Sequence, residues 1–126
     1  MARLGAVTTI RNVANGETIA RSVVGCDTFW KRGRGLMFRR PRAVVEDRVY
    51  VFVEGRESVA QAAIHMFFVF FPIAVVWLDR DRRVVDKVLA RPFRPYYAPS
   101  RPAQYYVEGH PGLLDKVNVG DQLEFV

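Results

Sequence analysis

Cysteine is almost missing from this chain: Cys26 is the only one among 126 residues. A single thiol has no intrachain partner, so a framework held together by disulfides is excluded. One cysteine also fits a reducing compartment. Residues 1–18 lack the apolar core of roughly 7–15 residues that a secretory signal peptide needs. We therefore expect a cytoplasmic protein without a signal peptide.

Lysine is also scarce, because 16 of the 19 cationic side chains are arginine. Only 13 acidic residues oppose them, which leaves a formal charge of +6. Arginine pairs well with phosphate, carboxylate and aromatic faces. The basic balance favours anionic partners, either nucleic acid or a small anion, without deciding between them. A chain of this length predicts a single domain over residues 1–126.

Long apolar runs are absent except at residues 62–78, where His65 is the only titratable side chain. A membrane helix needs roughly 20 apolar residues. This run contains Pro72 and is mostly β-branched or aromatic, which favours strands over a helix. Since proline cannot donate to a sheet ladder, we predict two strands, at about 62–70 and 73–79. Their continuous apolarity predicts a core covered on both faces, not a membrane anchor.

The other segments also read as short strands. Asn15-Gly16 predicts a hairpin turn between strands at residues 6–12 and 17–24. Further strands are predicted at 48–54, 83–89, 105–108 and 121–126, with a hairpin turn at 79–82. Short helices are predicted between Thr28 and Pro41 and over 112–117. The sequence therefore predicts a mainly β fold: a compact antiparallel β-sandwich or barrel-like single domain with two short helices.

Three motifs give the chain a resemblance to a known family. They are Arg34-Gly35-Leu36-Met37-Phe38-Arg39, Ile64-His65 through Pro72-Ile73 to Trp77-Leu78-Asp79, and Glu108…Gly112…Gly120-Asp121. With these motifs the chain resembles the DUF192 (UPF0127) proteins of bacteria and archaea, whose function is unknown, over about residues 20–126. The resemblance implies a compact, mainly β domain with short helices. It implies no activity, cofactor or catalytic residue.

The chain departs from this family in its central stretch. Many relatives are similar to HTFGMRFPIDVVFLD, whose Arg and Asp correspond to Phe70 and Ala74 here. If those two residues form a buried ion pair in relatives, losing only one would leave a desolvated charge at a cost of about 3–5 kcal/mol. The loss of both charged residues in this chain therefore favours the interpretation that the pair has a structural role in relatives. The alternative is that the pair is functional in relatives and that this protein has lost the function.

No motif in the chain predicts catalysis. His65 could bind a ligand or act as an acid–base group, but a core-edge histidine bonded to a carbonyl is the favoured interpretation. Cys26, His65 and His110 lack the paired spacing of zinc ligands, so we expect no metal site. Asp79, Asp81 and Asp121 lie at turns, where Asp usually accepts from backbone amides. With neither a nucleophile elbow nor a dinucleotide fingerprint, we expect a non-catalytic protein without a cofactor.

Two segments are candidates for binding. Residues 31–42 hold six cations near aromatic side chains, which suits nucleic acid, although a solvated helix face is the favoured interpretation. These cations are Lys31, Arg32, Arg34, Arg39, Arg40 and Arg42. The proline-punctuated loop 92–106 could rim a ligand pocket or cover an edge strand. Near this loop lie Tyr96, Tyr97, Tyr105, Tyr106, Arg91, Arg94 and Arg101.

We therefore predict a binding or accessory module that holds a small anionic ligand or a protein partner. The residues predicted to bind it are His65, Arg34, Arg39, Tyr96, Tyr97 and Asp79. Nucleic-acid binding through residues 31–42 is the alternative.

Overall fold

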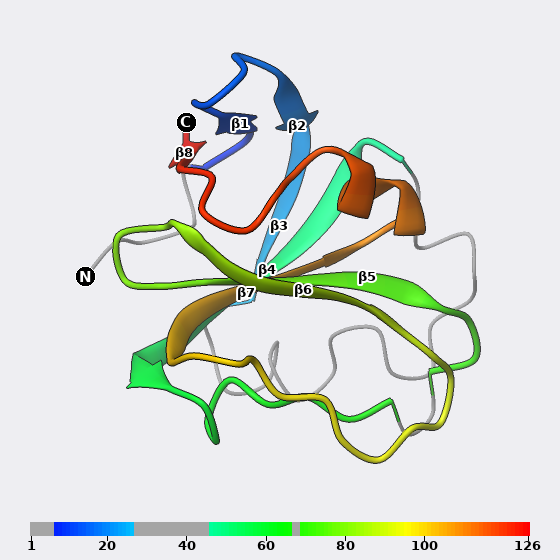
Figure 1. Ribbon diagram of the computed structural model, residues 1–126. Coiled ribbons are helices and arrows are strands. Elements are labelled where there is room, and N and C mark those ends of the chain that lie inside the picture. The colour runs from blue at the N-terminus through cyan, green and yellow to red at the C-terminus, as the bar shows by residue number, and fades with distance from the viewer. Residues whose placement is uncertain (1–6, 27–45, 67–68) are drawn as a thin grey trace.

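The computed structural model describes residues 7–26, 46–66 and 69–126. In this part of the chain eight strands form two sheets, shown with a short 3-10 helix in Figure 1. The elements are β1 (Ile10–Asn12), β2 (Thr18–Ala20), β3 (Ser22–Cys26), β4 (Arg48–Ser58), β5 (Ile73–Leu78), β6 (Val84–Ala90), β7 (Ala103–Gly109), η2 (Pro111–Asp115) and β8 (Leu123–Phe125). The predicted mainly β fold is confirmed.

The larger sheet has the strand order β3-β4-β7-β5-β6, and the smaller sheet has the order β2-β1-β8. Most neighbouring strands run antiparallel, but β3 pairs with β4 in parallel. The predicted helix over 112–117 appears as η2, whereas the one between Thr28 and Pro41 lies outside the described residues. Within the described ranges, no helix is long and apolar enough to cross a membrane.

The first hairpin forms at the predicted turn, where Gly16 adopts a positive φ of 74° and β1 pairs with β2. The predicted strand over 17–24 is wrong as a single element, because β2 belongs to the small sheet and β3 to the large one. The break falls at Arg21, where the amides of Arg21 and Ser22 both donate to the carbonyl of Asp47, at 3.2 and 2.9 Å. This contact directs the chain toward β4.

One face of the large sheet packs against the small sheet and η2. On β4 the side chains of Val49, Val51 and Val53 enter this first core, as the alternation along a strand requires. Tyr50 and Phe52 point to the opposite face and enter a second core. The strand predicted over 48–54 is therefore confirmed within β4, and its two faces belong to different cores.

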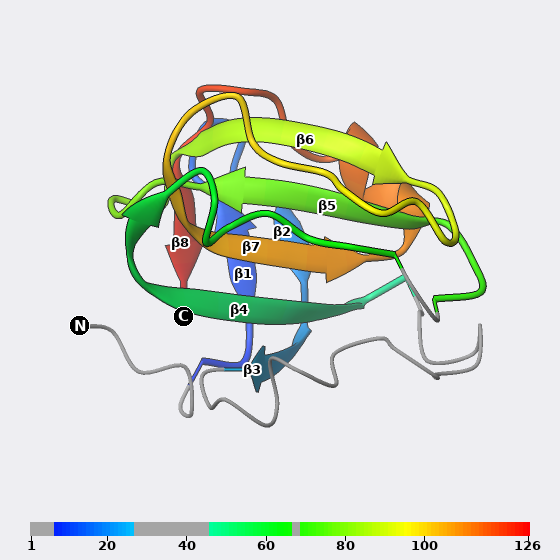
Figure 2. The same cartoon turned by 90° about the horizontal axis from the view of Figure 1, so that it is seen from below.

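Two loops cover that opposite face, and we call them the loop layer: residues 59–66 and 69–72 of one loop and 91–102 of the other. Figure 2 shows the loops crossing the sheet side by side. They pair through their backbones, because Ile64 and Tyr97 exchange N–H···O bonds of 2.8 and 2.9 Å. The Met66 amide donates to Arg94, and its carbonyl accepts from Phe93, both at 2.8 Å.

The prediction for the central apolar run is half confirmed. All six residues of β5 are buried, as expected of a strand covered on both faces. The predicted strand over 62–70 is wrong, since Ile64 makes only an isolated bridge to Tyr97 and residues 67–68 lie outside the described part. The run is apolar there because Ala62, Ile64 and Met66 pack onto the sheet. Trp77 fixes this loop by donating from Nε1 to the Ala62 carbonyl at 2.7 Å.

Replacing Trp77 with Phe should loosen the loop layer. The change keeps a ring in the core but leaves the buried Ala62 carbonyl without its donor, at a cost of about 1–3 kcal/mol. Urea unfolding should show this loss. Amide hydrogen exchange should become faster in residues 62–66 than the loss of global stability explains. The amides of β1 should exchange faster only to the extent of that global loss. An unchanged unfolding midpoint would show that this bond does not hold the loop.

Candidate functional site

The structure places the predicted binding residues in different parts of the molecule. His65, Tyr96 and Tyr97 lie together in the loop layer, where residues 64–66 pair with 93–97. Asp79 lies at the β5–β6 turn. The predicted arginines and lysine of segment 31–42, which include Arg34 and Arg39, lie outside the described residues. Of the predicted binding residues that the structure describes, those of the loop layer lie together as a candidate site.

Asp79 has a structural role in its turn. Its Oδ1 accepts from the amides of Asp81 and Arg83, at 2.9 and 3.0 Å. These bonds close a turn in which Arg82 has a positive φ of 66° and places its guanidinium 4.4 Å from the Phe125 ring centroid. The turn thereby connects the large sheet to β8. The Asp79 carboxylate already accepts hydrogen bonds from backbone amides, as Asp residues at turns usually do.

His65 lies at the edge of the second core, and its predicted bond to a carbonyl stays a prediction. It lies between the buried Ile64 and Met66, and its own side chain is exposed. Tyr96 is 63% exposed in the opposing loop segment. Tyr97 is half-buried, and its hydroxyl accepts from the Arg91 amide at 2.9 Å. Tyr96 is thus exposed to a partner, whereas the hydroxyl of Tyr97 is bonded within its own loop.

The other two tyrosines near this loop belong to the core. Tyr105 is buried in the first core and Tyr106 in the second. The Tyr106 ring stacks on Phe52 with the centroids 4.7 Å apart and the planes 7° from parallel. Successive side chains of β7 point to opposite faces of the sheet, so the two rings enter different cores. Both rings are buried, and neither is exposed at the surface of the loop layer.

Two phenylalanines that the sequence analysis did not select lie on the outside of the loop layer. Phe70 and Phe93 are 54% and 50% exposed. Their rings meet edge to face with the centroids 5.1 Å apart. Phe93 also has a φ of 62°. A bulky residue in this left-handed region costs on the order of 1–3 kcal/mol.

The charges of the loop layer all have one sign. Neither residues 59–78 nor residues 87–107 contain an Asp or a Glu. Three exposed arginines lie in the second loop, at positions 91, 94 and 101. We call the exposed set His65, Phe70, Arg91, Phe93, Arg94 and Tyr96 the loop-layer surface. It combines cations with exposed aromatic rings, a combination that suits an anionic partner with planar groups.

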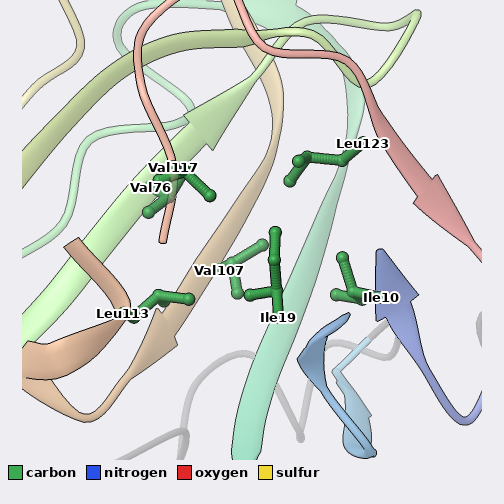
Figure 3. Close-up of a pocket in the computed structure, with 7 residues that line it drawn as sticks. All are labelled: Ile10, Ile19, Val76, Val107, Leu113, Val117 and Leu123. Carbon is green, nitrogen blue, oxygen red and sulfur yellow. The ribbon is translucent and has the colours of Figure 1, made fainter. Parts of the chain in front are cut away.

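The hollow shown in Figure 3 is part of the first core. Its side chains come from both sheets, from η2 and from the segment after η2, and all are aliphatic. They are Ile10, Ile19, Val76, Val107, Leu113, Val117 and Leu123. The space between them has no room for a water molecule. It is a packing gap and not a ligand site.

The geometry of this chain does not favour the buried ion pair considered for relatives at the positions of Phe70 and Ala74. Phe70 lies in a loop and is about half exposed, whereas Ala74 is fully buried in β5. Ala74 belongs to the first core, on the side of the sheet away from the loop layer. Side chains at these two positions therefore point to different sides of the large sheet. A buried pair between them does not explain the double change.

Glu108 is a buried carboxyl on the loop-layer side of the large sheet. It lies on β7 between Tyr50 of β4 and Val75 of β5, both in the second core. Its exposure is only 7%. Removal from water raises the pKa of Glu108 to about 8, so the carboxyl is mostly protonated at neutral pH. Glu108 belongs to one of the motifs shared with the family, but nothing local in the sequence signals its burial.

The described ranges contain no group of three His, Cys, Asp or Glu side chains that could hold a metal ion. His110 serves the backbone, because its Nδ1 accepts from the Gly112 amide at 3.0 Å at the start of η2. Asp121 accepts from Asn12 Nδ2 and from the Asn118 amide, each at 2.8 Å. These hydrogen bonds lower the pKa of Asp121. Both groups stabilise turns.

The open sheet, with a small sheet on one side and paired loops on the other, defines a small mainly β class of protein. The chain belongs to the DUF192 family (Uncharacterized ACR, COG1430), which matches residues 10–125. UPF0127 protein PF1050 of Pyrococcus furiosus is 40% identical over 116 residues, 90% of this chain and 95% of that protein. UPF0127 protein TK1120 of Thermococcus kodakarensis is 42% identical over 110 residues, 87% and 67% of the two chains.

Two crystal structures share the fold at low identity. A putative transcription regulator from Sinorhizobium meliloti is 21% identical, with a TM-score of 0.78 over 93% of this chain and 90% of that one. A protein of unknown function from Novosphingobium aromaticivorans is 20% identical, with a TM-score of 0.75 over 93% and 82%. At such identities the likeness shows the fold alone.

Replacing Glu108 with Gln should change how stability depends on pH. The carboxyl titrates at 4.5 when unfolded and at about 8 when folded. Between these values the folded state binds more protons, so the free energy of unfolding of the wild type should fall as pH rises. Between pH 5 and pH 8.5 the free energy of unfolding of the wild type should fall by an amount on the order of a few kcal/mol. Urea titrations at these two pH values should show no such fall for E108Q.

The exposed Glu17 in the first turn provides a control, since E17Q should follow the wild type. If the free energy of unfolding depended on pH in the same way for E108Q and the wild type, Glu108 would not be the source of the pH dependence.

Proposed function

We propose that this protein is a non-catalytic binding module that docks an anionic partner on its loop-layer surface. The observation that carries the proposal is the composition of that surface, which has exposed arginines and aromatic rings and no acidic residue. Arginine recognises phosphate and carboxylate groups through paired N–H donors. Exposed aromatic rings add apolar contact area when a partner covers them.

The paired loops are suited to present these side chains. Backbone bonds between residues 64–66 and 93–97 hold the two loops to each other. Two further bonds attach them to the sheet: Trp77 donates to Ala62, and the Ser100 amide donates to Asp86 Oδ2 at 2.9 Å. A surface held in this way loses less conformational entropy when it binds.

The exposed rings of the loop layer suit a partner with an extended surface. The exposed rings of Phe93 and Tyr96 stand on the outside of the loops. The aliphatic hollow of the first core offers no polar group and no room, so it supports no small-molecule site. Nucleic-acid binding through residues 31–42 remains a separate hypothesis, and the present proposal does not depend on that segment.

Removing the charges of Arg91 and Arg94 should weaken polyanion binding. We expect the R91Q/R94Q double variant to bind labelled inorganic polyphosphate about ten-fold more weakly at low salt, and with a shallower salt dependence. Fluorescence anisotropy over a range of salt concentrations measures both. The matched control is R11Q/R80Q, which removes two exposed cations from β1 and from the β5–β6 turn.

The control should bind polyphosphate nearly as the wild type does. Equal weakening in both double variants would mean that only the net charge matters, and would overturn the loop-layer surface as the site. Failure of the wild type to bind polyphosphate would overturn the proposal as well.

A further inference from the structure

We propose that the anionic partner is single-stranded nucleic acid, whose bases stack on Phe70, Phe93 and Tyr96 while its phosphates pair with Arg91 and Arg94. This inference rests on the proposed function and names the class of partner. Proteins that bind single strands without sequence preference use the same two elements: a cationic path for the backbone and aromatic side chains for the bases.

The aromatic side chains supply the first argument. Each is at least half exposed. Neither Phe70 nor Phe93 belongs to either core cluster. The two rings lie beside each other at the surface in an edge-to-face contact, with their planes 72° apart. The exposed parts of these rings are apolar surfaces on which unpaired bases can stack.

The backbone at Phe93 supplies the second argument. Its φ of 62° is one that glycine adopts freely and a bulky side chain does not. The amide of Phe93 bonds to Met66 whatever the side chain, so the loop pairing does not require a ring at this position. Fold stability alone therefore does not account for an exposed aromatic residue in a strained conformation.

The charge pattern selects among anionic partners. Arg91, Arg94 and Arg101 lie in a loop whose own sequence contains no Asp or Glu, so the surface attracts polyanions. An acidic peptide would use the arginines but would have little use for three exposed rings. A duplex keeps its bases stacked inside, so they are not accessible to surface rings. Unpaired bases linked by phosphates match both features.

Replacing Phe93 with Gly tests the inference, because it should separate binding from stability. We expect F93G to bind a labelled dT12 oligonucleotide about ten-fold more weakly, as the loss of one stacked base predicts. Its thermal unfolding midpoint should not fall, because glycine relieves the positive φ. The F93W variant keeps a ring and should bind at least as tightly as the wild type.

Two controls isolate the loss of the ring. F93N tolerates a positive φ without adding glycine flexibility, and it should bind as weakly as F93G. V119S changes another exposed apolar residue, 51% exposed near the turn at Gly120, and should bind as the wild type does. Wild-type binding by F93G and F93N would overturn the stacking role of Phe93.

Further probes separate this inference from the proposed function on which it rests. We expect dT12 to bind more tightly than an abasic 12-mer, inorganic polyphosphate, poly-glutamate or the dT12·dA12 duplex. If those probes bind as tightly as dT12, and only R91Q/R94Q weakens them, the inference fails and the proposed function stands. If neither dT12 nor any polyanion binds, both fail.

Discussion

β5 must be covered on both faces, and most of the structure follows from this constraint. Its six residues are all buried, with Ala74, Val76 and Leu78 in one core and Ile73, Val75 and Trp77 in the other. The small sheet and η2 cover the first face. Among the described residues, two loops and not a second sheet cover the other face. The bond from Trp77 to Ala62 joins β5 to that covering and gives the loops a fixed position.

Sequence patterns identified the strands in which the burial of successive side chains is regular. The alternation of β4 and the apolarity of β5 were readable because a strand sends successive side chains to opposite faces. Residues 62–66 are as apolar as a buried strand, but their backbone pairs with a loop. Apolar composition reports only that a segment is covered, and it does not show whether a ladder or a loop covers it. The boundary at Arg21 depends on the distant carbonyl of Asp47, which no local pattern indicates.

The candidate site was only partly readable for similar reasons. The missing acidic residues in 59–78 and 87–107 are visible in the sequence, and with Tyr96 they mark the second loop as cationic and aromatic. The exposure of His65 is not visible, because its apolar neighbours indicate burial. Nothing in the local sequence marks Phe93 for a positive φ, since glycine usually occupies that conformation. The pairing of two distant loops determines these features.

The two faces of the large sheet differ in how far their residues adopt the burial and backbone conformation that is usual for their residue type. The first core is mostly aliphatic, and a titratable neighbour such as Asp121 is held in a hydrogen-bonded turn. The other face carries two exceptions: Glu108 buried in the sheet, and Phe93 strained and exposed on the loops above it. The second described non-glycine residue with a positive φ, Arg82, lies in the turn that contacts β8, and its guanidinium packs on the Phe125 ring. In natural proteins such disagreements tend to gather at functional or strained sites. Because a contact within the fold accounts for Arg82, the exposed Phe93 is the exception that supports the proposal of the loop layer as the functional face.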